Sequence, residues 1–266
     1  MNSMVFSLSA LAALLPATLL PFMRQAARAD ALFWLLLGAA LAGSSALSIV
    51  SLGAHWQTGL VAALWVAVAV SLGLFGLLVL WNQVAARLTP LLLPYLLILG
   101  VLATGFAPLA KPEPALSAPD GWLMVHIAVS VATYALCTIA AVAGVAVFVQ
   151  ERALKRRRPN AFTRMLPSVA DAEGLETRLL VASEAVLGLG IITGVSELYM
   201  TSGNLFTLNH KSLLSVMAFL VIGFLLFLQH RSGLRGRRAA RIALVAYLLL
   251  TLGYLGVKFV TDILLA

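Results

Sequence analysis

The chain has 266 residues, of which 62% are apolar and only 11% are charged, and its mean hydropathy is +1.01. Soluble domains are closer to half apolar and a quarter charged, so the composition excludes a water-soluble fold. The formal net charge of +8 leaves open a nucleic-acid partner until the positions of the basic residues are known.

Apolar runs long enough to cross a bilayer, about 17–25 residues each, recur along the whole chain. The alternating pattern of a membrane barrel is absent, so the spans are predicted to be helices, which satisfy their own backbone hydrogen bonds. We predict an all-α polytopic membrane protein, a bundle of eight transmembrane helices that forms one domain over residues 1–266. The predicted spans are 3–22, 31–52, 60–81, 91–110, 122–150, 178–200, 212–229 and 241–263.

The first span has no basic residue ahead of it, whereas a secretory signal carries basic residues there, so we expect a retained helix. The connections between spans then alternate between two sides of the membrane. One side holds Arg24, Arg28, Arg87, Arg152, Lys155, Arg156, Arg157, Arg158, Arg164, Arg178, Arg231, Arg235, Arg237, Arg238 and Arg241. The other side holds only Lys111, Lys211 and Lys258. Because basic loops stay in the cytoplasm, both termini are predicted to lie outside it.

This bias also accounts for the net charge. The basic connections are short, and orientation together with contact to anionic lipid headgroups explains them, so we expect membrane lipid as a partner and no nucleic acid. The single cysteine, Cys137, allows no internal disulfide, no CxxC and no CxxCH. The protein is therefore neither a thiol oxidoreductase nor a c-type cytochrome, and no phosphate-binding loop indicates ATP as a fuel.

Topology separates the four histidines. His55, His126 and His210 are predicted at the outer face, whereas His230 is predicted at the inner end of the seventh span. His126 begins a narrow helical stripe of polar side chains, and Tyr134 lies at its edge. Such a stripe faces a bundle interior, where an ionisable group is a functional-site hypothesis.

His126 and His210 are predicted at the same depth. Two neutral imidazoles can hold a haem iron from both sides, which predicts non-covalent haem b with these residues as axial ligands. His55 and Trp122 are candidates to line the pocket, and His230 is a weaker candidate for a second, inner haem ligand. A zinc site would require three or four ligands, and His55 could supply a third, so metal binding stays open.

Other charged and small residues stand inside the sixth predicted span. Glu184 lies about two turns from the inner face, where an unpaired carboxylate is costly, so we expect it to be protonated or paired with a basic residue. A proton or ion relay would require more such groups than one. Lys211 adjoins His210 at the outer boundary, and the GxxxG step Gly190–Gly194 predicts close approach of another helix.

Several stretches resemble one family in order and spacing. They are "MVHIAVSVATYALCTIAAVAG", "LPSVADAEGLETRLL", "NHKSLLSVMAFL" and "GLRGRRAARIALVAYLLLTLGYLGVKFV". The chain resembles the cytochrome c assembly proteins, the CcsA-like haem-handling family, and within it the short YpjD-type inner-membrane members. In this resemblance the histidine and the tyrosine eight residues later match His126 and Tyr134, the HK(S/T) step matches His210 and Lys211, and "LETRLL" matches at Glu176.

The resemblance implies a multi-pass protein of the bacterial inner membrane, with the family domain covering about 60–263. It also implies a non-enzymatic role in presenting haem at the outer face, with cytochrome c maturation proteins and apocytochrome c as partners. No tryptophan follows Trp122, so the sequence lacks the tryptophan-rich outer segment of the larger members. A polytopic transporter or regulatory membrane subunit that keeps the fold without haem is therefore the alternative.

Overall fold

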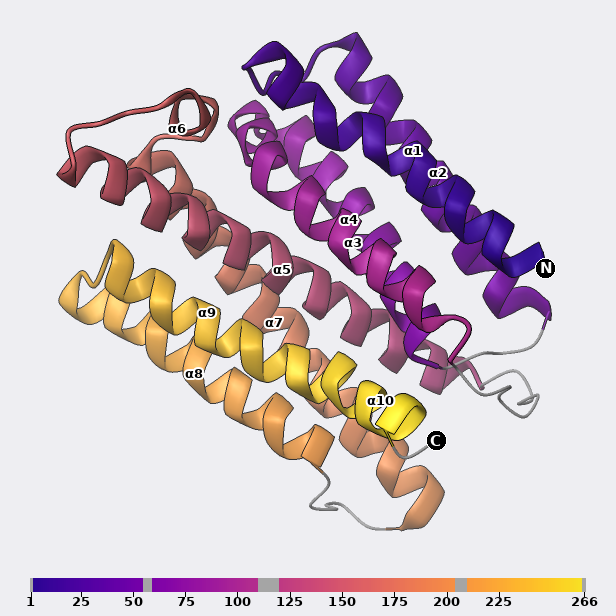
Figure 1. The fold of residues 1–266 in the computed structure, drawn as a ribbon. Coiled ribbons are helices and arrows are strands. Elements are labelled where there is room, and N and C mark those ends of the chain that lie inside the picture. The colour runs from indigo at the N-terminus through magenta and orange to yellow at the C-terminus, as the bar shows by residue number, and fades with distance from the viewer. Residues whose placement is uncertain (1, 55–58, 110–119, 204–209, 265–266) are drawn as a thin grey trace.

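The computed structural model describes residues 2–54, 59–109, 120–203 and 210–264, and every regular element within these ranges is a helix (Figure 1). The elements are α1 (Asn2–Arg24), α2 (Ala31–Ala54), α3 (Leu60–Trp81), η1 (Gln83–Leu88), α4 (Thr89–Phe106), α5 (Gly121–Lys155), α6 (Ala161–Met165), α7 (Val169–Ser202), α8 (His210–Ser232), α9 (Arg237–Thr251), η2 (Leu252–Gly256), α10 (Val257–Phe259) and η3 (Val260–Leu264).

Eight helices in the described part of the chain are long and apolar enough to cross a membrane, which confirms the predicted all-α class and the number of spans. The protein is a multi-pass membrane protein. The boundaries differ most at α7, which begins at Val169 rather than near 178. Charged residues lower the hydropathy of its first turns, but the Ser168 hydroxyl accepts a hydrogen bond from the Asp171 amide at 3.2 Å and caps the helix there.

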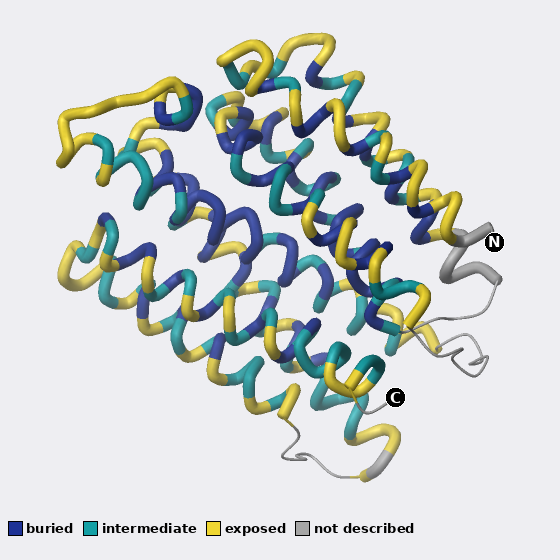
Figure 2. The backbone as a smooth tube through the Cα atoms, viewed as in Figure 1, coloured by how far each residue is buried: buried dark blue, intermediate teal, exposed yellow. Residues whose placement is uncertain are grey.

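The spans form two groups of four that meet along α5. The helices α1 to α4 pack against one another, and α5, α7, α8 and α9 form the second group. The helix α5 contacts α3 as well as α7 and α9, and its spanning window is the most buried of the eight (Figure 2). At 35 residues it is roughly 50 Å long, given 1.5 Å per residue, so it extends beyond the hydrocarbon core.

The antiparallel pair α5 and α7 approaches closely at small residues. A Cβ atom added at Gly194 would lie 2.9 Å from His126 Cε1, and one added at Gly190 would lie 3.5 Å from Val129 Cγ1. Nearer the other end, a Cβ at Gly144 would lie 2.8 Å from Glu176 Oε1. The predicted close approach at the GxxxG step is therefore confirmed. We call this α5–α7 interface the seam.

Three phenols, one buried and two half-buried, join the two groups of helices. Tyr95 on α4, Tyr134 on α5 and Tyr247 on α9 bring their hydroxyls together, with Tyr134 and Tyr247 at 3.0 Å and Tyr95 and Tyr134 at 3.3 Å. Tyr95 and Tyr247 are also hydrogen-bonded, and the Thr138 hydroxyl oxygen lies 3.2 Å from the Tyr247 hydroxyl. Each hydroxyl donates one proton and accepts others, so the three phenol oxygens satisfy one another. We call Tyr95, Tyr134 and Tyr247 the phenol joint.

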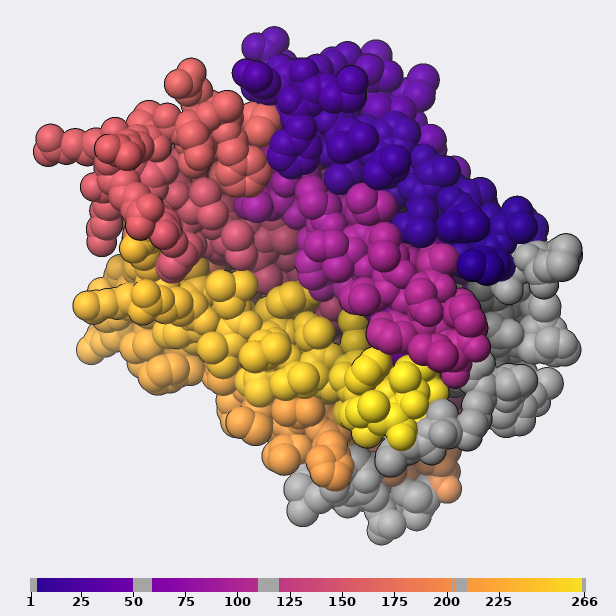
Figure 3. Space-filling view, in the orientation of Figure 1, coloured from indigo at the N-terminus to yellow at the C-terminus, as the bar shows by residue number. Residues whose placement is uncertain are grey.

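The C-terminal turns add a second joint. Asp262 accepts a hydrogen bond from the Leu60 amide at 2.8 Å and so caps the start of α3. Phe259 packs edge to face on Phe106 of α4, with ring centroids 5.4 Å apart. Figure 3 shows the atoms of these last turns against those of α3 and α4.

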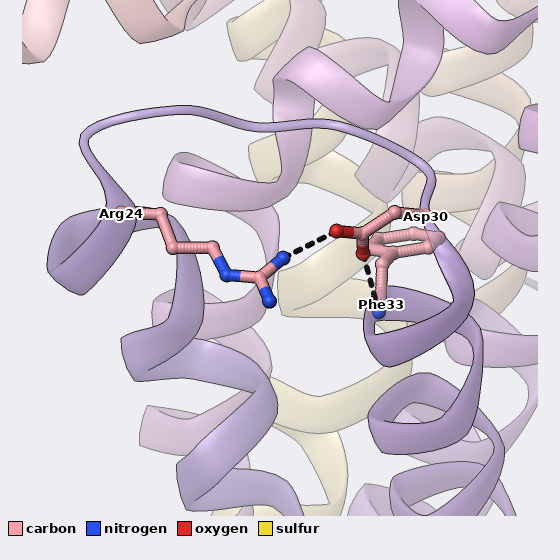
Figure 4. A network of polar contacts seen from close by, with 3 residues as sticks. All are labelled: Arg24, Asp30 and Phe33. Carbon is pink, nitrogen blue, oxygen red and sulfur yellow. Dashed lines mark hydrogen bonds and ion pairs between the residues drawn. The ribbon is translucent and has the colours of Figure 1, made fainter.

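The connection between α1 and α2 is held by one aspartate (Figure 4). Asp30 accepts from the Phe33 amide at 2.9 Å and pairs with the guanidinium of Arg24, the last residue of α1. The Phe33 amide, with the Arg24 charge, holds the pKa of the Asp30 carboxyl below its ordinary value. This carboxylate thus fixes the sharp return of the chain at the basic end of the bundle.

The helix α1 begins and the C-terminal turns end at the same end of the bundle, as an even number of spans requires (Figure 1). We call this the terminal end, and the opposite end, where the arginine-rich connections lie, the basic end. Which end faces the cytoplasm stays a prediction from the charge bias.

Replacing Tyr247 by phenylalanine tests the phenol joint. Tyr247→Phe removes the oxygen shared by Tyr95, Tyr134 and Thr138, and the expected loss of stability is about 1–2 kcal/mol. Thermal unfolding in detergent should show a lower midpoint for this variant. The control is Tyr199→Phe, because Tyr199 is 56% exposed and its loss of a hydroxyl should leave the midpoint unchanged. Equal midpoints for all three proteins would contradict the joint.

Candidate ligand-binding cavity

A cavity of about 540 Å³ opens between α5, α7, α8 and the last turns of the chain, at the terminal end. Its size lies within the range of about 300–1,000 Å³ that small-molecule and cofactor sites occupy. Most of its wall is apolar, from leucine, isoleucine and valine side chains. The polar lining residues are His126, Ser130, Thr133, Tyr134, Glu197, Thr201, Lys211, Ser212, Ser215, Tyr254 and Lys258.

The orientation of the His126 ring is fixed by α7. Its Nδ1 lies 3.0 Å from the Thr193 hydroxyl oxygen, and that hydroxyl donates its own proton to the Gly190 carbonyl at 3.1 Å. Because the Thr193 proton is engaged there, its oxygen is placed to accept from His126, which favours the neutral tautomer with the proton on Nδ1. In that tautomer Nε2 is unprotonated, and no described residue hydrogen-bonds to it. The ring thus has one nitrogen available for a ligand.

The seam supplies the space that this ring occupies. Gly194 lies against the imidazole, where any larger side chain would collide with Cε1. Trp122, one turn earlier on α5, donates its indole N–H to the Thr193 carbonyl at 3.3 Å. The predicted residues Trp122 and His126 therefore both bind the same turn of α7.

Tyr134 also lines the cavity, and its hydroxyl belongs to the phenol joint. Its ring lies 5.5 Å from that of Tyr254, which lies within the π-helical segment Leu252–Gly256. Segments of π-helix are frequent at functional sites because they change which side chains face inward. Here the segment places Gly253 and Tyr254 on the cavity wall.

Charged side chains from three helices line the cavity. Glu197 belongs to α7, Lys211 to α8, and Lys258 to α10. His210 precedes Lys211 as the first residue of α8, where it is exposed, and it is not among the lining residues. The structure therefore places His126, Tyr134 and Lys211 around one cavity, with His210 beside the Lys211 turn.

The remaining predicted residues lie elsewhere. His230 is exposed in the last turn of α8, at the basic end. Glu184 is half-buried on α7 below the cavity, and one of its carboxyl oxygens is buried without a hydrogen-bond partner among the described residues. His55 lies outside the described residues. Within the described ranges no three His, Cys, Asp or Glu side chains gather as metal ligands, and the zinc hypothesis stays open only through His55.

Three residues that matter here were not predicted as part of the site. Thr193 orients His126, and its position beside Gly194 in the GxxxG step was the available signal. Tyr254 and Lys258 reach the cavity through the π-helical turns, and no sequence pattern indicates such turns.

The fold and cavity define a polytopic helical membrane protein with a largely apolar cavity, lined in part by His126, near one end of the bundle. The chain belongs to the cytochrome c assembly protein family, whose model matches residues 33–265. This confirms the resemblance noted in the sequence.

Relatives agree with this assignment. A 28.8 kDa protein of Azospirillum brasilense, described as uncharacterized and encoded in a nifR3-like 5′ region, is 50% identical over 99% of both chains. Protein HemX of Brevibacillus brevis is 27% identical over 50% of this chain and 49% of its own. Inner membrane protein YpjD of Escherichia coli K12 is 28% identical over 53% of this chain and 52% of its own. No solved structure matches the chain.

The tautomer of His126 can be measured directly. In protein labelled with ¹⁵N-histidine, at a pH where the ring is neutral, the Nδ1–H form should dominate because Thr193 accepts that proton. Thr193→Val removes the acceptor and should give a mixture of tautomers. The control is Thr201→Val, because the Thr201 hydroxyl bonds only carbonyls of α7. This variant should leave the His126 signals unchanged. A dominant Nε2–H form in the unaltered protein would refute the assignment.

Proposed function

We propose that this protein binds haem b in the cavity at the terminal end and holds it for cytochrome c assembly. The observation that carries the proposal is the His126 ring, whose Nδ1 is held by Thr193 and whose Nε2 is left for a metal. Metal-ligating histidines commonly donate their other N–H to an acceptor, which fixes the ring and raises its basicity. An isolated packing histidine would not require this arrangement beside a cavity.

The rest of the cavity suits the same group. Haem is a flat apolar macrocycle with two carboxylates at one edge, and the wall is largely apolar with Lys211 and Lys258 among its charged residues. His126 would hold the iron as one axial ligand, and we assign His210, beside Lys211, as the candidate for the opposite position. When bound, haem supplies the iron and the vinyl groups; the chain binds and orients it, and is not itself an enzyme.

The family supports the wider role. Membership among the cytochrome c assembly proteins, and the name of the YpjD relative, favour a protein of the bacterial inner membrane that works with cytochrome c maturation proteins and apocytochrome c. The charge bias favours both termini, and therefore the cavity, outside the cytoplasm. We therefore propose that haem attachment takes place outside the cytoplasm.

Haem titration of the purified protein in mild detergent tests the ligand. The unaltered protein should develop a Soret band, and His126→Ala should lose most of it because the oriented ligand is gone. His210→Ala should weaken the band or shift it toward five-coordinate iron. Thr193→Val should weaken haem affinity by roughly 10–100-fold, the usual effect of removing the group that orients a ligand.

The matched control is His230→Ala, because His230 is exposed at the basic end, away from the cavity. Its Soret band should equal that of the unaltered protein. A protein that stays colourless throughout the titration, or a band that survives in His126→Ala but not in His230→Ala, would overturn the proposed site.

The orientation has its own test. A reporter enzyme that is active only outside the cytoplasm, fused after residue 266, should be active. The same reporter inserted after Arg157, in the basic connection between α5 and α6, should be inactive. The reverse pattern would place the cavity on the cytoplasmic side and remove the link to haem attachment outside.

A further inference from the structure

The seam continues from the cavity to the basic end as a line of small and polar residues. His126 lies on Gly194 near the terminal end, and Glu176 lies on Gly144 nearer the basic end. Between these levels the Cys137 thiol lies beside the fully buried Ser183 hydroxyl. Glu176, Ser183 and Gly190 follow one another two helical turns apart, so one stripe of α7 faces α5 throughout.

Glu176 is not explained by packing. It is 1% exposed, and its Oε1 has no hydrogen-bond partner within the described ranges. Gly144 leaves the space for this carboxyl, and Ala240 of α9 closes the third side. A small apolar residue would fill such a place without burying a polar atom, and buried polar atoms without partners cost free energy. An unpartnered carboxyl at this place in a membrane span therefore indicates a function.

Three charged residues, Arg237, Glu151 and Glu173, lie toward the basic end from Glu176. Arg237 Nε lies 3.2 Å from Glu151 Oε2, and its guanidinium lies 4.8 Å above the Phe148 ring, so this arginine contacts α5, although its Nε and Nη2 form no hydrogen bond to a described residue. Glu173, one turn before Glu176, is half-buried, and it and Glu151 both approach Gly236, which precedes α9. These two carboxylates stand between Glu176 and the solvent of the basic end.

Glu184 lies further toward the cavity, on the side of α7 that faces α8. It lies eight residues after Glu176, roughly 12 Å along the helix, and one turn before Leu187, which lines the cavity. Its Oε2 is buried without a described partner. Its Oε1 faces Gly223 of α8, where an added Cβ atom would lie only 2.9 Å from this oxygen. The buried hydroxyl of Ser183 lies one residue before Glu184, between the two carboxyls along the helix, and donates to the Leu180 carbonyl at 3.0 Å.

We propose that this line conducts protons between the basic end and the cavity, with Glu176 and Glu184 as the proton-carrying groups. Glu151 and Glu173 exchange protons with solvent. Each buried carboxyl accepts a proton on one oxygen and releases one from the other, so charge and atoms balance and no electron moves. The proposal goes beyond haem binding and does not depend on it, because it concerns only the chain's own carboxyls.

Proton uptake by reconstituted vesicles tests this path. Purified protein is placed in liposomes that contain a pH-sensitive dye, and a potassium diffusion potential, negative inside, is applied with valinomycin. Vesicles with the unaltered protein should acidify faster than protein-free vesicles. Glu176→Gln and Glu184→Gln keep the shape but cannot release a proton, so each should return the rate to that of protein-free vesicles.

Two matched controls separate conduction from damage to the fold. Asp171→Asn changes an exposed carboxylate of the same helix and should keep the full rate. Gly144→Ala places a Cβ 2.8 Å from Glu176 Oε1 and should slow uptake, whereas Gly105→Ala meets nothing within 4 Å and should not. Unfolding midpoints for all variants show which of them remain folded.

Unaltered protein that acidifies no faster than empty liposomes would overturn the proposal. So would full rates in folded Glu176→Gln and Glu184→Gln variants. Either result leaves the haem titration unaffected, so the two proposals fail separately.

Discussion

The close approach of α5 and α7 is the constraint on which the rest of the structure depends. Glycine at 144, 190 and 194 removes the side chains that would hold the two longest helices apart. In a membrane, where lipid competes for apolar surface, such contact and its hydrogen bonds replace the hydrophobic effect as the driving force between helices. The imidazole of His126 can reach the Thr193 hydroxyl only because Gly194 leaves it that space.

The same seam connects two regions of different chemistry. Toward the terminal end the helices diverge around a largely apolar cavity, and the last turns of the chain complete its wall. Toward the basic end they close around the Glu176 carboxyl. The phenol joint lies between them and ties α4, α5 and α9 together, so the cavity wall and the first group of helices are held in one arrangement. Binding at one end and proton transfer along the seam would thus share one rigid pair of helices.

Burial of polar groups distinguishes residues that pack from residues that act. Thr133 and Thr138 are buried, but each bonds a backbone carbonyl one turn earlier, which is a common solution inside membrane helices. Glu176 and Glu184 have buried oxygens for which no described residue supplies a partner. The two threonines stabilise their helix, whereas an unpartnered carboxyl inside a membrane span costs stability, which is why we assign a function to these two glutamates.

The sequence by itself determined the class, the eight spans and the segregation of arginines to one end, because these follow from hydropathy and local charge. It also indicated the stripe that begins at His126 and the close contact at Gly190 and Gly194, since helical periodicity fixes both. Only the tertiary structure decided that α7 starts early enough to bury Glu176, because a helix cap and neighbouring glycine outweigh the low hydropathy of that segment. It alone brought Thr193 to His126 and turned Tyr254 and Lys258 into the cavity, since these contacts join helices that are distant in the sequence.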